Sequence, residues 1–239
     1  MSMHPSASSK STTHEKLITI DGPSASGKST LSRHLSRKLG WEWVSTGAFY
    51  RGLAFVALEE NISLEEGTSL AKLAQDQGLW QVVLAEEATR VFYRNQDVTQ
   101  LIRHEDIGLM ASRISKIPVV RQALLQAQRD CYHPTKGLIA EGRDCGTVVF
   151  PQAPLKIFLT ADLESRSQRR SLQELGTNQS ESLKQKQLER DTQDAQRSVA
   201  PTAKALDALE IDTTHIDPEQ LLEMILSIIK TKYAEWLKP

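Results

Sequence analysis

The residues best suited to chemistry lie in the stretch GPSASGKS, from Gly22 to Ser29, which fits the pattern G-x-x-x-x-G-K-S. Glycines in such a turn let backbone N–H groups face a polyphosphate, and the N-terminus of a following helix adds a positive dipole. Lys28 can reach the β- and γ-phosphates, and the Ser29 hydroxyl can hold Mg²⁺. The turn lies between an apolar run, Leu17–Ile20, and a helical pattern, as this motif requires. The stretch predicts a nucleoside triphosphate site, which a kinase, a GTPase or an ATPase could use.

Two of these classes carry further motifs. A GTPase would also show Asn-Lys-x-Asp, which reads guanine, and Asp-x-x-Gly, and neither occurs in the chain. A motor-type ATPase would show an apolar run that ends in an acid, and the closest match is Leu138–Glu141. The missing motifs therefore disfavour a GTPase.

Three further segments place arginines beside predicted turns or helix starts. They are STGAFYRG (45–52), IAEGRDCGTVVF (139–150) and LERDTQDAQR (188–197). In the third segment Arg190, Asp194 and Arg197 are four and three residues apart, so they share one face of a helix. Phosphoryl transfer between two anions needs several fixed cations, and arginine offers phosphate a bidentate fork. The segments favour phosphoryl transfer, but their spacing does not name the acceptor.

The chain that must position these residues alternates apolar strands with helices. The strands are expected at Leu17–Ile20, Trp41–Val44, Leu138–Ala140, Leu155–Leu159 and Leu209–Ile211. The helices are expected at Lys28–Leu39, Ala48–Glu59, Leu64–Gln77, Glu105–Ser115, Val119–Cys131, Asp162–Leu175, Glu181–Arg197 and Pro218–Trp236. Val82–Leu84 and Val91–Tyr93 interrupt the alternation as a small hairpin, which indicates an insertion. The pattern predicts an α/β fold with a parallel five-stranded sheet covered by helices.

Composition places the chain among ordinary globular proteins. Its 239 residues, 39% hydrophobic and 25% charged, suffice for one large α/β domain or one core with insertions. A net charge of -1 gives no overall attraction to nucleic acid or to an anionic membrane. No apolar stretch approaches the about 18–20 residues that span a bilayer. Two cysteines cannot form a disulfide framework, which suits the cytoplasm, and the polar residues 1–15 are expected to form a disordered tail.

Five blocks of the sequence resemble bacterial-type cytidylate kinases, in the same order and at similar intervals. They are DGPSASGKST, STGAFYR, GRDCGTVVFP, KIFLTA and ERDTQDAQRSVAP, and the resemblance covers roughly residues 16–235. It implies a nucleoside monophosphate kinase fold in a single domain over residues 16–239: a P-loop NTPase core, an NMP-binding part at about 46–120 and a lid at about 165–195. The implied reaction is transfer of the γ-phosphoryl group of ATP, with Mg²⁺, to CMP or dCMP. The resemblance also implies a monomer whose partners are these small-molecule substrates, with no nucleic acid and no membrane.

The same resemblance assigns roles to individual residues. It places ATP against Gly22, Pro23, Ser24, Ala25, Ser26, Gly27, Lys28, Ser29, Thr30 and Arg169, with Ser29 at the metal. It places CMP against Thr46, Arg51, Ser112, Arg121, Arg143, Asp144, Asp194 and Arg197. The implied catalytic set is Lys28, Arg143, Arg190 and Arg197. Asp144 and Arg121 suit cytosine, because its amino group can donate to a carboxylate and its O2 and N3 can accept from a guanidinium.

Two alternatives stay open at this point. The chain could be another small P-loop kinase that acts on AMP, shikimate or a different monophosphate, and a screen of acceptors would separate these. It could instead be a non-catalytic nucleotide-binding or nucleic-acid-binding module that uses its arginines for backbone contacts. The near-zero net charge speaks against the second alternative.

Overall fold

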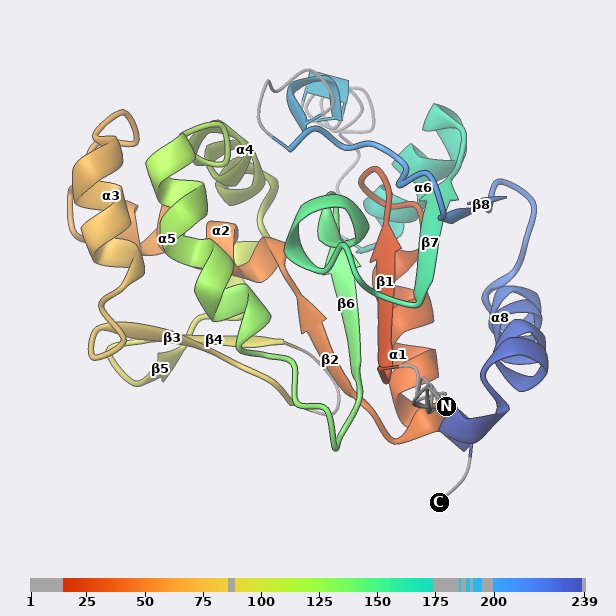
Figure 1. The fold of residues 1–239 in the computed structure, drawn as a ribbon. Helices are drawn as coiled ribbons and strands as arrows, with labels where there is room; N and C mark the ends of the chain where they lie inside the picture. The colour runs from red at the N-terminus through yellow and green to blue at the C-terminus, as the bar shows by residue number, and fades with distance from the viewer. Residues whose placement is uncertain are drawn as a thin grey trace, which may run out of the picture.

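A parallel five-stranded sheet forms the centre of the chain (Figure 1). The computed structural model describes residues 15–85, 89–173, 185, 188–189, 191–194 and 200–237. Across the sheet the strands follow the order β2 (Glu42–Ser45), β6 (Leu138–Gly142), β1 (Leu17–Asp21), β7 (Leu155–Thr160) and β8 (Leu209–Asp212). Neighbouring strands all pair in parallel. The sheet confirms the predicted fold class, and each predicted strand lies within one or two residues of an observed one.

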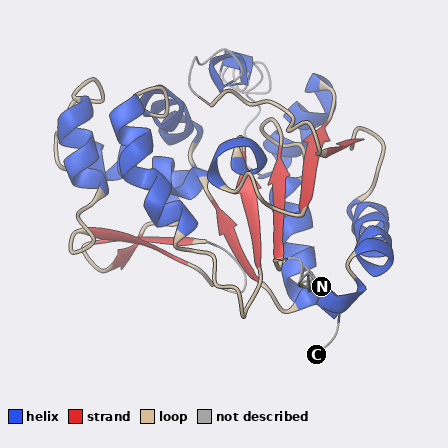
Figure 2. Ribbon diagram, in the orientation of Figure 1, coloured by secondary structure: helices blue, strands red, loops and turns tan. Residues whose placement is uncertain are grey.

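Helices cover both faces of this sheet (Figure 2). Helices α1 (Lys28–Leu39) and α8 (Pro218–Lys232) cover one face, and α2 (Gly47–Glu59) and η2 (Cys145–Val149) cover the other. Side chains alternate between the two faces along a strand. In β1, Ile18 and Ile20 therefore pack toward α1 and α8, whereas Leu17 packs with the opposite cluster. Both faces are buried, which explains why β1 is a continuous apolar run in the sequence.

Element η2 is a five-residue π-helix that the sequence analysis did not predict. It follows directly on a turn formed by Arg143 and Asp144, at the carboxyl end of β6. π-Helical turns are rare and frequently occur at functional sites. The loops at the carboxyl ends of parallel strands are also where open α/β sheets bind ligands. The segment after β6 is therefore placed where a site would be expected.

Between β2 and β6 the chain builds a second group of elements, to the left of the sheet in Figure 1. After α2 it contains α3 (Gly67–Ala74), β3 (Trp80–Val83), β4 (Arg90–Tyr93), β5 (Gln96–Asp97), η1 (Leu101–Arg103), α4 (Glu105–Ile114) and α5 (Pro118–Arg129). Strands β3, β4 and β5 form an antiparallel sheet. The predicted hairpin is thus confirmed, but the two-residue strand β5 was not predicted. Helix α3 is shorter than the predicted helix at Leu64–Gln77.

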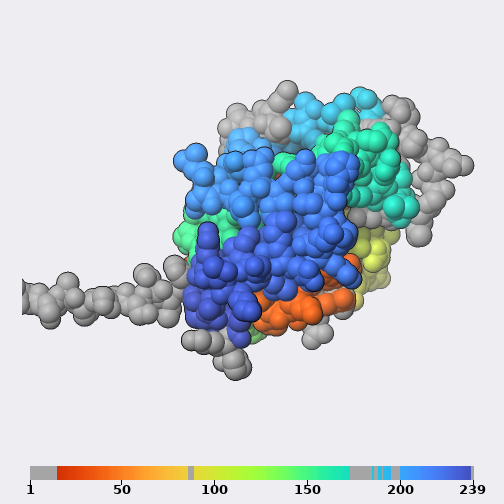
Figure 3. Space-filling view, turned by 90° about the vertical axis from the view of Figure 1, so that its right-hand side faces the viewer, coloured from red at the N-terminus to blue at the C-terminus, as the bar shows by residue number. Residues whose placement is uncertain are grey.

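The carboxyl-terminal part of the chain closes the face that carries α1. Strand β7 leads into α6 (Leu163–Gln173), and β8 leads into α8. Asp217 caps α8 by accepting hydrogen bonds from two backbone N–H groups of its first turn. The predicted single helix at Pro218–Trp236 is wrong at its end, because α8 stops at Lys232 and a separate 3₁₀ helix, η3 (Ala234–Leu237), follows. In Figure 3 residues 200–237, in blue, cover most of the face turned to the viewer.

Some predictions fall outside the described residues. They include most of the predicted tail, residues 1–14, and most of the helix predicted at Glu181–Arg197. Two residues of the implied catalytic set, Arg190 and Arg197, are among them. Within the described part of the chain, no helix combines the length and apolarity that crossing a bilayer requires.

Candidate active site

The segment from Gly22 to Gly27 is a tight loop that joins the carboxyl end of β1 to α1. Gly22 has a φ of 144°, and a Cβ atom there would lie 2.1 Å from the carbonyl oxygen of Leu159, so a larger residue cannot take this place. Gly27, with a φ of 94°, turns the chain directly into the first residue of α1. The loop therefore presents a helix N-terminus at a strand end, which is an anion-binding arrangement.

Lys28 and Ser29 begin α1 and face different partners. The Lys28 Nζ atom lies 2.5 Å from the carbonyl oxygen of Pro23 and 3.5 Å from Ser26 Oγ, so the ammonium group is held against the loop. Ser29 Oγ donates to Glu141 Oε1 over 2.7 Å. Glu141 is buried at the end of β6, and its Oε2 atom has no hydrogen-bond partner among the described residues. A hydroxyl and a carboxylate with a spare buried oxygen fit a divalent cation, because Mg²⁺ prefers oxygen ligands.

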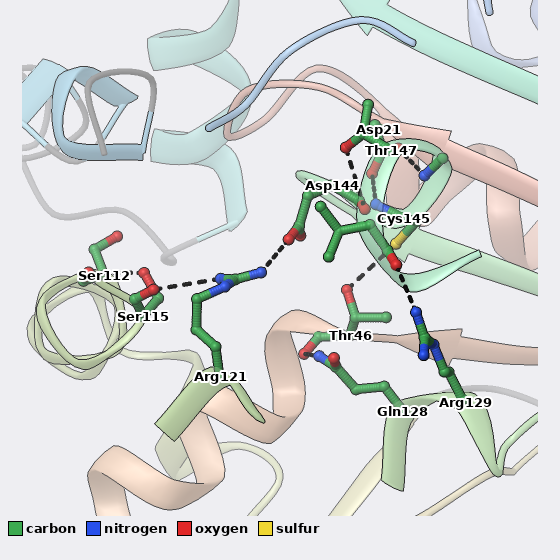
Figure 4. Close-up of polar contacts among 12 residues, drawn as sticks. Asp21, Thr46, Ser112, Ser115, Arg121, Gln128, Arg129, Asp144, Cys145 and Thr147 are labelled. Atoms are coloured by element: carbon green, nitrogen blue, oxygen red, sulfur yellow. Dashed lines mark hydrogen bonds and ion pairs between the residues drawn. The ribbon is translucent and has the colours of Figure 1, made fainter. Parts of the chain in front are cut away.

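Arg121 of α5 and Asp144, the residue before η2, form a buried ion pair (Figure 4). Arg121 also donates from Nη1 to the carbonyl oxygen of Ser115 over 3.3 Å. Its guanidinium carbon lies 5.6 Å from the centre of the Tyr50 ring, which is a cation–π contact. A buried ion pair is weak evidence for stability, since desolvation of both charges opposes their attraction. Asp144 lies just after the carboxyl end of β6, where open α/β sheets bind ligands, and this position favours recognition of a polar ligand instead.

A second group of hydrogen-bonded and charged side chains is centred on Asp194. Its Oδ1 atom accepts from Ser112 Oγ over 2.8 Å, and its Oδ2 atom accepts from Arg143 Nε over 3.0 Å. The partners lie 82 and 51 positions away in the sequence and belong to α4 and to the turn before η2. The structure thus brings together three of the residues that the resemblance assigned to CMP.

Arginines of α6 contact both sides of the site. Arg166 Nη1 donates to the Ser24 carbonyl oxygen over 3.3 Å and pairs with Asp191, whose Oδ1 accepts from the Ser24 N–H over 3.1 Å. Arg170 pairs with Glu105 of α4 over 2.6 Å. The described residues at 166–170 and 191–194 therefore touch the phosphate loop and the neighbouring helix α4 together.

Arg169 reaches the phosphate loop less directly than Arg166. It donates to Thr213 Oγ1 over 3.1 Å and to the Thr213 carbonyl oxygen over 2.6 Å. The Thr213 hydroxyl lies 3.0 Å from the carbonyl oxygen of Ser26. The structure thus links Arg169 to the loop through Thr213, and a contact between Arg169 and a donor phosphate stays a prediction.

Thr46 and Arg51 flank the first turn of α2. Thr46 Oγ1 is buried, donates to the Glu141 carbonyl oxygen over 2.9 Å and lies 3.4 Å from Cys145 Sγ. A Cβ atom at Gly142 would lie 2.3 Å from Thr46 Oγ1, so glycine is needed for this close packing. Arg51 Nη1 donates to the carbonyl oxygens of Ile102 and His104, over 2.6 and 3.0 Å. The expected contacts of Thr46 and Arg51 with CMP stay predictions.

Two ionisable groups beneath the site have strongly raised pKa values. Burial raises the pKa of Asp21 to about 6, against hydrogen bonds from the N–H groups of Gly146 and Cys145, and the charge of Asp144 raises it further. Burial also raises the pKa of the Cys145 thiol well above its ordinary value, and the charges of Asp21 and Asp144 add to the effect. Cys145 is therefore not a thiolate nucleophile.

Comparison with known proteins identifies the family. The sequence pattern described as Cytidylate kinase matches residues 18–231 of the chain. The chain belongs to the cytidylate kinase family. Among the relatives is the cytidylate kinase of Bdellovibrio bacteriovorus, 53% identical over 216 residues, which are 90% of this chain and 98% of that protein. Another, from Pseudomonas syringae pv. tomato, is 46% identical over 217 residues, 89% of this chain and 94% of its own. A solved gluconokinase from Sinorhizobium meliloti 1021 shares 14% of residues at a TM-score of 0.46, over 91% of this chain and 95% of its own.

For this member of the cytidylate kinase family, reasoning from the sequence missed three carboxylates of the site. In the sequence Glu141 stands out only as the end of an apolar run, because its pairing with Ser29 depends on which face of β6 it occupies. Asp191 lies in the block that carries Asp194, three residues away on the same helix, so its charge was a signal that could have been used. Asp21 had no signal beyond its place before Gly22.

Proposed function

We propose that the chain catalyses transfer of the γ-phosphoryl group of ATP to CMP or dCMP, giving CDP or dCDP and ADP. As a member of the cytidylate kinase family it is an ATP-dependent nucleoside monophosphate kinase. The observation that carries the choice of acceptor is the buried pair of Arg121 and Asp144. The carboxylate can accept from the amino group of cytosine, and the guanidinium can donate to N3 or O2. If a base with a different pattern of hydrogen-bond donors and acceptors enters, the charges of this buried pair are left unmatched. The pair therefore discriminates between cytosine and other bases.

At the donor end, the loop from Gly22 to Gly27 and Lys28 would hold the phosphates of ATP. The helix N-terminus and the ammonium group supply the positive charge that the β- and γ-phosphates require. Ser29 and Glu141 would hold the Mg²⁺ that accompanies ATP, the hydroxyl and the spare carboxylate oxygen serving as its ligands or as acceptors for its water molecules. When bound, Mg²⁺ neutralises part of the charge on the phosphates.

At the acceptor end, Arg143 and Arg51 would bind the phosphate of CMP, and Ser112 and Asp194 would line the nucleoside. The family resemblance adds Arg190 and Arg197, which lie outside the described residues. Both substrates are anions, so the arginines lower the repulsion between them and stabilise the charge of the transferred group. The acceptor oxygen of CMP is already deprotonated at neutral pH, so the reaction needs positioning and charge stabilisation rather than a strong general base.

The contacts of Arg166, Arg170 and Asp191 support a lid at about residues 165–195, and the group of elements after β2 supports an NMP-binding part at about 46–120. Asp191 holds the lid helix against the Ser24 N–H of the phosphate loop, and Arg170 joins α6 to Glu105 of α4. A lid that touches donor and acceptor sides at once can exclude water from the transferred group. Exclusion of water would suppress hydrolysis of ATP without transfer.

An ADP-release assay across CMP, dCMP, UMP, AMP and shikimate tests the proposal. We expect rapid release with CMP and dCMP, slower release with UMP, and background release with AMP and shikimate. A reaction without acceptor measures the hydrolysis that the closed lid should prevent. A clear preference for AMP or shikimate would refute the proposed acceptor while leaving the donor site intact.

A further inference from the structure

Asp144 stands at the N-cap position of η2 but does not cap it. An aspartate at this position usually accepts a hydrogen bond from a backbone N–H of the first turn that follows. Asp144 makes no such bond, and its carboxylate points toward Arg121 instead (Figure 4). The first N–H groups of η2 must therefore find another acceptor, because buried donors are costly when they are left unpaired.

Asp21 supplies that acceptor from a different strand. Its Oδ1 atom accepts from the Cys145 N–H over 2.8 Å, and its Oδ2 atom accepts from the Gly146 N–H over 2.7 Å. Asp21 is the last residue of β1 and is paired in register with Gly142 of β6, so its strand end lies beside the turn that leads into η2. Within β1 it alternates with Ile20, which faces α1, so its side chain is directed to the face that carries η2.

The packing around this contact leaves little freedom. Asp21 is 4% exposed, and a Cβ atom on Gly146 would lie 2.9 Å from Thr19 Oγ1 and 3.4 Å from Asp21 Oδ2. Glycine at this position lets the start of η2 approach β1 closely enough for both hydrogen bonds. One carboxylate thus fixes two successive peptide groups, Asp144–Cys145 and Cys145–Gly146.

We propose that Asp21 is a positioning residue for acceptor specificity: by capping η2 from β1, it leaves the Asp144 carboxylate available to read the amino group of the acceptor base. The inference rests on the proposed function, in which Asp144 reads cytosine. Asp21 also directly precedes Gly22, the first residue of the phosphate loop. The same side chain therefore ties the donor loop to the residue that selects the acceptor.

The charge of Asp21 supports a role beyond packing. Burial and the nearby charge of Asp144 raise its pKa to about 6, so keeping it ionised at neutral pH opposes folding. Only a carboxylate offers two equivalent acceptor oxygens for two adjacent N–H groups. An asparagine of the same shape would offer one oxygen and turn an NH₂ group toward the second N–H.

The test is the Asp21→Asn variant, measured by kcat/KM for CMP and for UMP. We expect the ratio of kcat/KM for CMP to kcat/KM for UMP to fall, because the Asp144 carboxylate can turn back to the N–H groups of its own helix. The expected decrease is about 5- to 150-fold, which corresponds to the about 1–3 kcal/mol that one base contact provides. Thr19→Val is the matched control. It lies on the same strand, and its buried hydroxyl has no hydrogen-bond partner among the described residues, so the ratio should stay at the wild-type value.

The Asp144→Asn variant and the double variant separate the inference from the proposed function. If Asp21 acts through Asp144, the double variant should discriminate no worse than Asp144→Asn alone, whereas independent sites would add their effects. Loss of discrimination in Asp144→Asn with wild-type discrimination in Asp21→Asn would overturn the inference and leave the proposed function standing. Wild-type discrimination in Asp144→Asn would refute the base-reading role itself.

Folding is monitored by urea unfolding of each variant, since loss of stability alone would not change the ratio of two substrates. If Asp21→Asn does not yield folded protein, Asp21→Ala is measured in the same way, because it removes both acceptor oxygens without turning an NH₂ group toward the N–H groups of Cys145 and Gly146. Unchanged discrimination in that variant would equally overturn the inference.

Discussion

The donor and acceptor regions proposed for this kinase are built in opposite ways. The phosphate-binding part of the donor region is one contiguous stretch, residues 21–30, in which glycines shape the backbone and a helix N-terminus supplies the positive charge. The acceptor region is made of side chains from α2, α4, α5, the turn before η2 and the segment at 191–194. Its charged groups are paired with one another, as in Arg121–Asp144 and Arg143–Asp194. Backbone recognition suits a feature that all triphosphates share, whereas paired side chains can distinguish one base from another.

The largest expected effect comes from Arg143→Ala, in the acceptor region. Removing a cation that stabilises charge on the transferred group should lower kcat by about 100- to 1000-fold. ATP binding should change little, because the donor loop contacts its phosphates independently. Steady-state kinetics and an ATP-binding titration measure the two quantities.

The control for this variant is Arg94→Ala, which removes an exposed arginine paired with Glu60, outside the site. Its turnover should equal that of the wild type. Near-normal turnover in Arg143→Ala would remove Arg143 from the chemistry and would leave the acceptor region with a binding role only.

The next largest effect is expected from Asp144→Asn, which is measured with two acceptors, CMP and UMP, to compare the two regions. Asp144→Asn replaces an acceptor oxygen with an NH₂ group, which opposes the amino group of cytosine and suits the O4 atom of uracil. The preference for CMP over UMP should fall about 5- to 150-fold, and the KM for ATP should stay within a few-fold of the wild type. Kinetics with both acceptors at saturating ATP check this, and an equal loss on CMP and UMP would contradict it.

A smaller effect is expected on the donor side from Glu141→Gln. The amide keeps an acceptor for the Ser29 hydroxyl but removes the negative charge and one oxygen from the metal site. The Mg²⁺ concentration needed for half-maximal rate should rise about tenfold, the lower range for disturbed metal sites, with the CMP-to-UMP preference unchanged. Titration of the rate with Mg²⁺ at fixed ATP measures the shift, and the Mg²⁺ dependence of the binding of a fluorescent ATP analogue gives a readout that does not depend on turnover. An unchanged Mg²⁺ requirement would show that Glu141 only supports Ser29.

The contrast between a contiguous phosphate loop and dispersed acceptor residues also determines what could be predicted from the sequence. The phosphate loop was predictable because its chemistry is contiguous and its glycines are required by positive φ angles and by close approach at Gly22. The proposed acceptor residues Arg121, Asp144 and Asp194 lie far apart in the chain, and only the resemblance of whole blocks to a family assigns them. The two alternatives of another kinase or a binding module could not be separated from spacing alone.

Other features depend on geometry that no single segment encodes. The pairing of Ser29 with Glu141, and of Asp21 with η2, follows from the register of β1 against β6 and from the face that each residue occupies. The π-helix η2 has only five residues, which are too few to show a periodic pattern in the sequence. Strand β5 is too short for a pattern as well, and it is recognised only by its pairing with β4.

The last expected change is in stability rather than in rate, and it concerns the junction between the two regions. The pKa of Asp21 is raised to about 6 in the folded chain from an ordinary 3.8, so between these values the folded state binds more protons than the unfolded state. The contribution of Asp21 to stability is therefore fully present below about pH 3.8 and is lost as the pH rises through 6, by at most about 1.4 kcal/mol per pH unit. Asp97 behaves in the opposite way. Hydrogen bonds from Thr99 and the partner Arg90 lower its pKa to about 2, so its contribution disappears only as the pH falls through 2, outside this window.

The difference in unfolding free energy between the wild type and Asp21→Asn isolates this effect, because all other titrating groups are common to both chains. From pH 4 to pH 6 the wild type should lose stability relative to the variant, as measured by urea unfolding at half-unit steps. At pH 7 the variant should be no less stable than the wild type, although it discriminates less well between CMP and UMP. A constant difference across this range would mean that Asp21 does not titrate there. A variant that gains stability while losing discrimination would show that the buried charge at the junction is kept for selection of the acceptor, at the expense of stability.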